Sequence, residues 1–260
     1  MDPPSLHDYY LSVNITPTTY FKNALSMDRL EVAREWSSLG KPVDREQWDM
    51  TVPTVNAYYN PPGNEIVFPA GIMQFPVFDV KVPQYLSYGA FGSVSGHELS
   101  HAFDSTGRHY DQNGNYTDWW TKSTVEGFKK RADCFIDQYS QYSVPGPNGE
   151  PLHVNGKLTL GENIADAGGV TAAFGAWKKR QAETPNEHLP GLSHFTQEQL
   201  FFVNYANAWC GKSRDATAVN RIYTDPHSPK WVRILGTMAN SRDFKESFKC
   251  KVTKPTCELW

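Results

Sequence analysis

Two histidines four residues apart, His97 and His101, constrain this chain more than any other feature of its sequence. They lie in a segment whose apolar residues recur at helical spacing, so we expect a helix. Because side chains four residues apart project from one face of a helix, both imidazoles can bind one zinc ion at about 2.0 to 2.1 Å. Glu98 lies beside that face, where its carboxylate can accept a proton from a water molecule at the metal. The apolar residues of the segment are Phe91, Val94, Leu99 and Phe103.

The simpler interpretation of this segment is two buried histidines that flank an acid by chance. With 8 histidines and 13 glutamates in 260 residues, random order produces the pattern in about one chain in a hundred. A catalytic zinc site also needs a third protein ligand. The metzincin pattern would place glycine at position 104 and histidine at 107, whereas the chain has Asp104 and Gly107 there. The metzincin class is therefore excluded.

The best candidate for the third ligand is Glu162, four residues before Asp166 on another expected helix. The two acids share a face, so Glu162 can coordinate the metal while Asp166 accepts the outward N–H of a ligand histidine. An acidic pair facing solvent is the alternative. Asp104 is a second candidate for orienting a histidine, with surface capping as an equal alternative. The neighbours of Glu162 are small or apolar and favour close packing: Leu160, Ile164, Ala165, Ala167, Gly168 and Gly169.

Other segments carry helical patterns and helix-start signals. Ser123 and Glu126, and likewise Thr196 and Gln199, have the spacing of a capping box. We therefore expect a mainly α fold with a small β-sheet, which belongs to the α+β class. The expected helices cover residues 18–39, 123–139, 160–177 and 196–209, with another that has Ser228 as N-cap, Pro229 first and Ile234 inside; the expected strand is Ile66-Val67-Phe68.

Composition bounds the class of protein. A mean hydropathy of −0.55 and the lack of any apolar run of about 18 residues favour a soluble globular chain without a membrane-spanning segment. The net charge is −3, with no block of like charges, so nucleic acid and anionic membrane surfaces are not expected partners. No signal peptide, internal repeat or low-complexity linker is visible, and we expect one domain.

Cysteine spacing and glycosylation motifs indicate the compartment. The four cysteines lie too far apart for the close pairs of a zinc finger. Asn14-Ile15-Thr16 and Asn115-Tyr116-Thr117 would accept glycans in a secreted protein. Together these features favour an oxidising, extracellular setting. The cysteines are Cys134, Cys210, Cys250 and Cys257.

Taken in order, the motifs of residues 55–260 resemble the neprilysin and endothelin-converting-enzyme family of zinc endopeptidases. The resemblance implies a thermolysin-like zinc peptidase catalytic domain in which His97, His101 and Glu162 bind one Zn²⁺ and Asp166 supports them. The matching stretches are Val55-Asn56-Ala57-Tyr58-Tyr59, Ile66-Val67-Phe68-Pro69-Ala70-Gly71-Ile72, Gly96-His97-Glu98-Leu99-Ser100-His101-Ala102-Phe103-Asp104, Gly161-Glu162-Asn163-Ile164-Ala165-Asp166, Trp209-Cys210-Gly211, Asp225-Pro226-His227-Ser228-Pro229 and Cys257-Glu258-Leu259-Trp260.

The resemblance also implies roles for residues that composition does not single out. Asn56 and Ala57 would hold the substrate backbone on the leaving side of the scissile bond, and Arg233 would bond its carbonyl oxygen. His227 would stabilise the tetrahedral oxyanion. From sequence alone, His227 would be an ordinary turn residue and Arg233 a surface charge. The substrates would be oligopeptides cut before a hydrophobic residue, whose pocket matches Ile72, Val77, Ser93, Val94, Ala208 and Trp209.

Members of this family are several hundred residues longer, so residues 1–260 would be the C-terminal portion of the catalytic domain, without the upstream lobe that encloses the site. By resemblance, Cys134 pairs with Cys257, while Cys210 and Cys250 pair with upstream cysteines. Glu258 agrees with the endothelin-converting branch, because neprilysin has arginine there. Two rival hypotheses remain open: a metal-free or inactive fragment that serves as an interaction module, and a structural zinc protein.

Overall fold

The computed structural model describes residues 3–259 and divides the chain into two compact units, which separate after Gln47. The first unit contains helices α1 (Pro3–Tyr10) and α2 (Tyr20–Ser37), and neither helix buries a residue. They are joined through Tyr9, whose hydroxyl donates to Glu31 at 3.0 Å and whose ring lies 3.8 Å from the Arg34 guanidinium carbon. The helix predicted over residues 18–39 is confirmed. We expected one domain throughout, and the assignment of all 260 residues to one catalytic domain stays a prediction.

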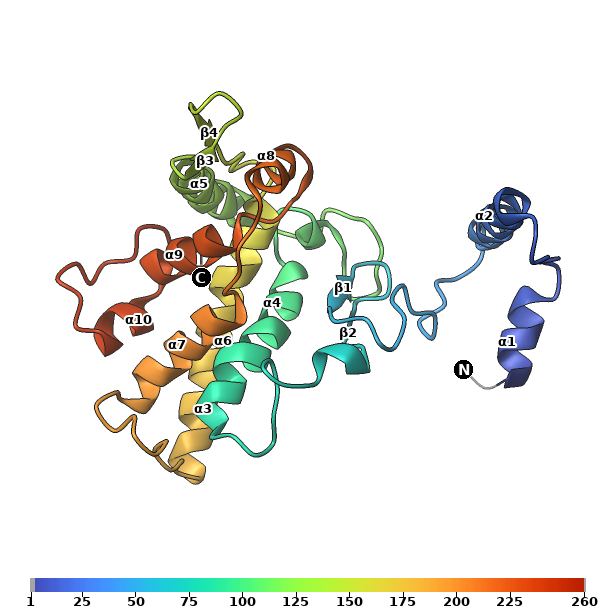
Figure 1. Ribbon diagram of the computed structural model, residues 1–260. Helices are drawn as coiled ribbons and strands as arrows, with labels where there is room; N and C mark the ends of the chain where they lie inside the picture. The colour runs from blue at the N-terminus through green and yellow to red at the C-terminus, as the bar shows by residue number, and fades with distance from the viewer. Residues whose placement is uncertain (1–2, 260) are drawn as a thin grey trace. The chain divides into compact units, whose positions relative to one another are not determined.

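The second unit is built around two helices, α4 (Ser93–His101) and α6 (Leu160–Glu183), which share the most extensive contact in the chain. In Figure 1, α6 runs through the middle of the unit, with α4 on one side and α9 (Lys230–Asn240) on the other. α4 is preceded by α3 (Gln84–Ser87) and a π-helical turn, η2 (Tyr88–Gly92). The predicted helix around the two histidines is confirmed, as is the helix from Leu160, which extends six residues beyond the expected end.

Glycines allow α4 and α6 to touch backbone to backbone. A methyl group on Gly96 would lie 2.7 Å from the carbonyl oxygen of Gly169, and one on Gly169 would lie 2.6 Å from the amide nitrogen of His97. Both separations are shorter than ordinary contacts of about 3.5 Å. Only residues without a Cβ fit here, and this close packing fixes the spacing of the two helices.

Two apolar clusters flank this helix pair. One surrounds Phe135 and Tyr139 of α5 (Lys122–Tyr139), and the other surrounds Phe201 of α7 (Gln197–Ala208) and Trp177 of α6. All four of these aromatic side chains are fully buried, which is expected because large rings contribute most of the apolar area of a core. The surrounding helices are α5 (Lys122–Tyr139), α7 (Gln197–Ala208), α8 (Asp215–Thr224), α9 (Lys230–Asn240) and α10 (Arg242–Ser247).

The helix-start predictions had mixed outcomes. The capping box of Thr196 and Gln199 is confirmed, with both reciprocal hydrogen bonds formed. The N-cap predicted at Ser123 was wrong, because Thr121 has the extended backbone of a cap and its hydroxyl accepts from the Thr124 amide. The N-cap predicted at Ser228 was also wrong. α9 starts one residue later, after Pro229, and the Ser228 hydroxyl donates to another helix instead.

The predicted small sheet consists of two separate antiparallel hairpins. β1 (Tyr58–Asn60) pairs with β2 (Glu65–Val67), and β3 (Ser143–Pro145) pairs with β4 (Pro151–His153). β2 falls one residue before the predicted strand. β1 lies against α4. Short 3₁₀ turns occur at η1 (Ala70–Ile72) and η3 (Gly107–His109). The α+β class is confirmed, and within residues 3–259 no helix is both long and apolar enough to span a membrane.

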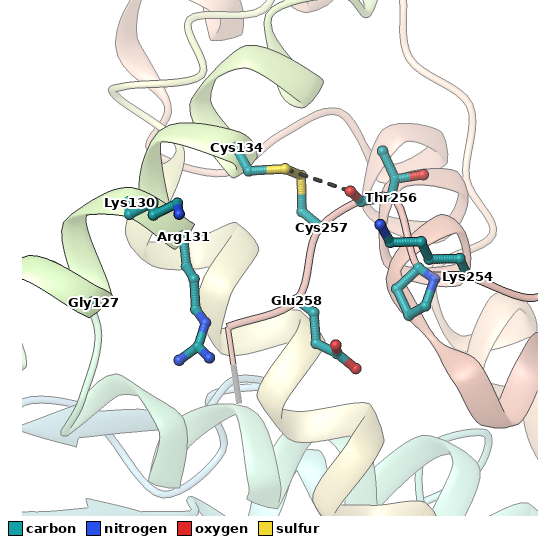
Figure 2. A pocket seen from close by; sticks show the side chains of 9 residues that line it. Gly127, Lys130, Arg131, Cys134, Lys254, Thr256, Cys257 and Glu258 are labelled. Atoms are coloured by element: carbon teal, nitrogen blue, oxygen red, sulfur yellow. Dashed lines mark hydrogen bonds between the residues drawn. A yellow bond between two sulfur atoms is a disulfide. The ribbon is translucent and has the colours of Figure 1, made fainter. Parts of the chain in front are cut away.

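The C-terminal segment folds back onto α5. The predicted disulfide between Cys134 and Cys257 is formed, with 5.8 Å between the Cα atoms. The Asn240 side chain accepts a hydrogen bond from the Cys257 amide, and Arg242 donates to Glu258 at 2.7 Å. Figure 2 shows the hollow of about 400 Å³ beside this bridge. Trp260, which ends the last matching motif, lies outside the described residues.

Candidate active site

The two histidines of α4 face one point. His97 is buried and His101 is half-buried, and their Nε2 atoms lie 3.0 Å apart. The four-residue spacing produces this convergence because both residues project from the same face of the helix. The backbone contact between α4 and α6 then decides what lies opposite them.

Glu162, in the first turn of α6, lies opposite the two imidazoles. Its Oε2 atom is 3.2 Å from His97 Nε2 and 3.6 Å from His101 Nε2. This oxygen is buried, and no described residue forms a well-aligned hydrogen bond with it. Three potential electron-pair donors, the two Nε2 atoms and Glu162 Oε2, thus surround one point.

The donor set fits a zinc ion. In a tetrahedral site with bonds of about 2.0 to 2.1 Å, the ligand atoms lie about 3.3 Å apart, and the three separations here are 3.0, 3.2 and 3.6 Å. Ligand atoms of His97, Glu98 and His101 also fall within 4.8 Å of one another. Glu162 Oε2 is a candidate third donor, at 3.2 and 3.6 Å from the two imidazole nitrogens.

Two aspartates orient the histidines through their outward nitrogens. Asp166 Oδ1 lies 2.9 Å from His97 Nδ1, and Asp104 Oδ2 lies 2.6 Å from His101 Nδ1. A carboxylate at Nδ1 favours the tautomer that carries its proton there, which leaves Nε2 with a lone pair for a metal. The structure therefore places both candidate orienting acids, each on a different histidine.

Asp166 remains ionised in spite of its burial. Burial raises its pKa, but the guanidinium of Arg233 and the hydrogen bond from His97 outweigh that effect and hold the pKa at about 2. Arg233 donates to both carboxylate oxygens at 2.7 Å, and its guanidinium carbon lies 3.8 Å from the Trp209 ring centroid. Arg233 is only 5% exposed. Arg233, which sequence alone suggested to be a surface charge, is therefore a buried partner of the acid that orients His97.

Glu98 and His227 border the same point. Glu98 is buried, and burial raises the pKa of its carboxyl, although the imidazoles of His97 and His101 offset part of that shift. His227 lies in the loop between α8 and α9, with Nε2 at 3.2 Å from Glu162 Oε2 and Nδ1 at 2.8 Å from Asp225 Oδ1.

Asp225 was missed as a functional residue by the sequence analysis. It stands two residues before His227 in a motif that contains two prolines, and that pattern was the available signal. Its carboxylate accepts from both the backbone amide and the imidazole of His227. His227 is thus oriented by an acid in the same way as the two histidines of α4.

The residues assigned by resemblance to substrate binding occupy several elements. Asn56 is exposed before β1, and Ala57 is buried beside it. Ile72 is buried in η1, and Val94 lies on α4 three residues before His97. Among the described hydrogen bonds, none joins Asn56 to the metal-facing side chains. Trp209 contacts the site through the guanidinium group of Arg233.

A mainly helical fold in which two histidines of one helix meet an acid of a second, packed helix defines the thermolysin-like class of metallopeptidase folds. Comparison with known proteins narrows this class: residues 56–258 match the profile of peptidase family M13. The chain therefore belongs to peptidase family M13.

Relatives and solved structures agree with this placement. The whole chain is 44% identical to endothelin-converting enzyme 1 of Homo sapiens and 45% identical to neprilysin-3 of Drosophila melanogaster, covering 34% and 33% of those proteins. It superposes on the zinc metalloprotease Zmp1 of Mycobacterium tuberculosis in complex with an inhibitor with a TM-score of 0.87 and 38% identity, covering 95% of this chain and 38% of that one. The chain spans about a third of the length of the curated relatives it matches.

Proposed function

We propose that the chain is the catalytic part of a zinc-dependent endopeptidase that hydrolyses oligopeptides. The observation that carries this proposal is the convergence of His97, His101 and Glu162 at separations that fit tetrahedral zinc. Names of relatives such as endothelin-converting enzyme support a peptide substrate. A structural zinc site would require a fourth protein ligand at this point; in the proposed site that position is left to water, and the adjacent Glu98 has the role of general base.

Each polar residue of the site has a part in the proposed reaction. When bound, the metal would polarise the scissile carbonyl group and make water more acidic. Glu98 accepts a proton from the attacking water and then delivers it to the departing amine. Burial raises the pKa of Glu98, which makes its carboxylate a stronger base and favours the first of these transfers.

His227 and Arg233 act on the substrate. The adjacent carboxylate of Glu162 raises the pKa of His227, which favours the imidazolium form with a proton on each nitrogen. Nδ1 then donates to Asp225, and Nε2 donates to the oxygen on which negative charge develops. Arg233 is fixed by Asp166 through Nε and Nη2. Within the described residues its Nη1 group makes no hydrogen bond, so it can donate to a substrate carbonyl oxygen. Asn56 and Ala57 hold the substrate backbone.

The proposed specificity is cleavage before a hydrophobic residue. The pocket for that residue would be lined by Ile72, Val94 and Trp209, with the small residues Val77, Ser93 and Ala208 leaving room for a large side chain. Apolar side chains bind such pockets through the area that they remove from water.

The proposed setting is extracellular, with the upstream lobe of longer family members as a partner. The Cys134–Cys257 bridge supports an oxidising compartment. Cys210 is exposed and Cys250 half-buried, and both are free thiols, which agrees with partners outside residues 3–259. Exposed aromatic residues on α2, including Tyr20 and Trp36, are a second feature that such a lobe would cover.

Glu98→Gln tests the mechanism. The variant should keep bound zinc, measured by mass spectrometry of metal content, and lose about a hundredfold or more of its turnover of a mixed peptide library. Glu126→Gln, the same change on the exposed side of α5, is the matched control and should behave as wild type. Near-normal turnover by zinc-loaded Glu98→Gln would contradict the assigned base. A zinc-loaded wild-type chain that cleaves no peptide would instead favour the inactive zinc-binding fragment.

A further inference from the structure

Adjacent residues of α6 contact adjacent residues of the loop that joins α8 to α9. Glu162 Oε2 lies 3.2 Å from His227 Nε2. The next residue of each segment forms a second pair, in which the Ser228 hydroxyl donates to Asn163 Oδ1 at 2.8 Å. The proposed function uses the first pair and leaves the second without a role.

The second pair belongs to a chain of buried hydrogen bonds in which each side chain donates to the next residue of that chain. Asn163 is fully buried, and Ser228 and Thr159 are each 3% exposed. The Asn163 amide group donates to Thr159 Oγ1 at 2.9 Å, and the Thr159 hydroxyl donates to the Asn155 carbonyl at 3.1 Å. Because Asn163 Nδ2 donates to Thr159, Asn163 Oδ1 is the atom that accepts from Ser228. Buried polar groups that are fully paired in this way define one arrangement of the backbone.

His227 has few other supports. Its Nδ1 is held by Asp225, which belongs to the same loop, and its side chain is 43% exposed. Among the hydrogen bonds and ion pairs of the described chain, only the hydrogen bond between Ser228 and Asn163 and the contact of His227 Nε2 with Glu162 Oε2 tie residues 225–229 to α6. The position of the imidazole over Glu162 therefore depends on the neighbouring pair.

We infer that Asn163 and Ser228 are a positioning pair that holds the His227 loop in register with α6 and aims Nε2 at the substrate oxygen. The inference rests on the proposed function, in which His227 donates to the oxyanion. Neither residue of the pair touches the substrate, and both act through His227. Displacing a hydrogen-bond donor of the active site by about 1 Å lowers the reaction rate by about a hundredfold. A single hydrogen bond that fixes such a donor can therefore have a large effect on turnover.

Ser228→Ala tests the inference, because it removes one oxygen atom. In the zinc-loaded chain it should lower kcat by about tenfold to a hundredfold with KM near that of wild type. Ser228→Thr keeps the hydroxyl and should restore turnover. Ser247→Ala is the matched control, since its hydroxyl bonds only the Asp243 carbonyl of its own helix. Circular dichroism checks folding, and Thr159→Val, which breaks the far end of the hydrogen-bond chain, should lower kcat in the same way.

Two further measurements separate positioning from a merely structural role. In a His227→Ala background, Ser228→Ala should cause no additional loss, because the group that it positions is gone. In the metal-free chain, the imidazole resonances of His227 in ¹H–¹⁵N spectra, assigned by their absence from His227→Ala, should shift in Ser228→Ala and return in Ser228→Thr. Equal losses of kcat in both backgrounds, or unchanged resonances, would overturn the inference.

The failure of the proposed function gives a different result. If the zinc-loaded wild-type chain hydrolyses no peptide, the proposed function is wrong, and the spectra of the metal-free chain still decide the positioning role. If wild type is active and His227→Ala is impaired while Ser228→Ala is not, only the positioning pair is wrong.

Discussion

Replacing Gly169 by alanine should separate α4 from α6 and weaken metal binding. The new methyl group would lie 2.6 Å from the His97 amide nitrogen and 2.6 Å from the Ser93 carbonyl oxygen. Ordinary contacts need about 3.5 Å, so the helices must move apart by about 0.9 Å. These neighbours are backbone atoms, which cannot rotate away as a side chain would.

That displacement acts directly on the proposed ligand set. His97 belongs to α4 and Glu162 to α6, and their facing atoms are 3.2 Å apart. Metal–ligand distances tolerate only about ±0.2 Å, so a shift of about 0.9 Å removes one donor from reach. Loss of a residue that supports a metal ligand typically lowers metal affinity by about 10- to 100-fold, and we expect zinc affinity to fall by at least that much. The metal-free chain should lose about 1–3 kcal/mol of stability.

The assay is competition with a chromogenic chelator for zinc, together with thermal unfolding of the metal-free chain. Gly175→Ala is the matched control, because it makes the same change in the same helix at a site with nothing within 4 Å. The Gly175→Ala variant should be more stable than wild type by about 0.5–1 kcal/mol and should bind zinc with unchanged affinity. Wild-type zinc affinity in Gly169→Ala would refute the claim that this backbone contact sets the metal site.

Three further changes test separate parts of the chain. Glu162→Val should abolish zinc binding in equilibrium dialysis because it removes a ligand, and wild-type affinity would show that another residue is the third ligand. Replacing Cys134 and Cys257 by serine opens a loop of 123 residues and should cost about 4 to 5 kcal/mol in denaturant unfolding; an unchanged midpoint would refute that contribution. Thr196→Ala removes the acceptor for the Gln199 amide and should lower stability by about 1 kcal/mol, whereas a stabilised variant would contradict the cap.

Local spacing in the sequence was enough to predict the helices that carry the site. His97 and His101, and likewise Glu162 and Asp166, share faces because four residues complete about one helical turn. The capping box at Thr196 follows from contacts only three residues apart. The same reasoning misplaced the start of α5, because the hydroxyls of Thr121 and Ser123 could each cap a backbone amide three residues later. In the structure, Thr121 has the extended backbone of an N-cap and accepts from the Thr124 amide.

Only the tertiary structure decided which distant residues meet. Asp166 orients His97 and not His101, Arg233 is buried against Asp166, and Ser228 reaches Asn163 across 65 residues of sequence. No periodic pattern links such positions, since helical spacing constrains only neighbours within a turn or two. Their separations depend on how closely α4 and α6 approach, and that approach is set by backbone contact at glycines, where the sequence shows merely the absence of a side chain.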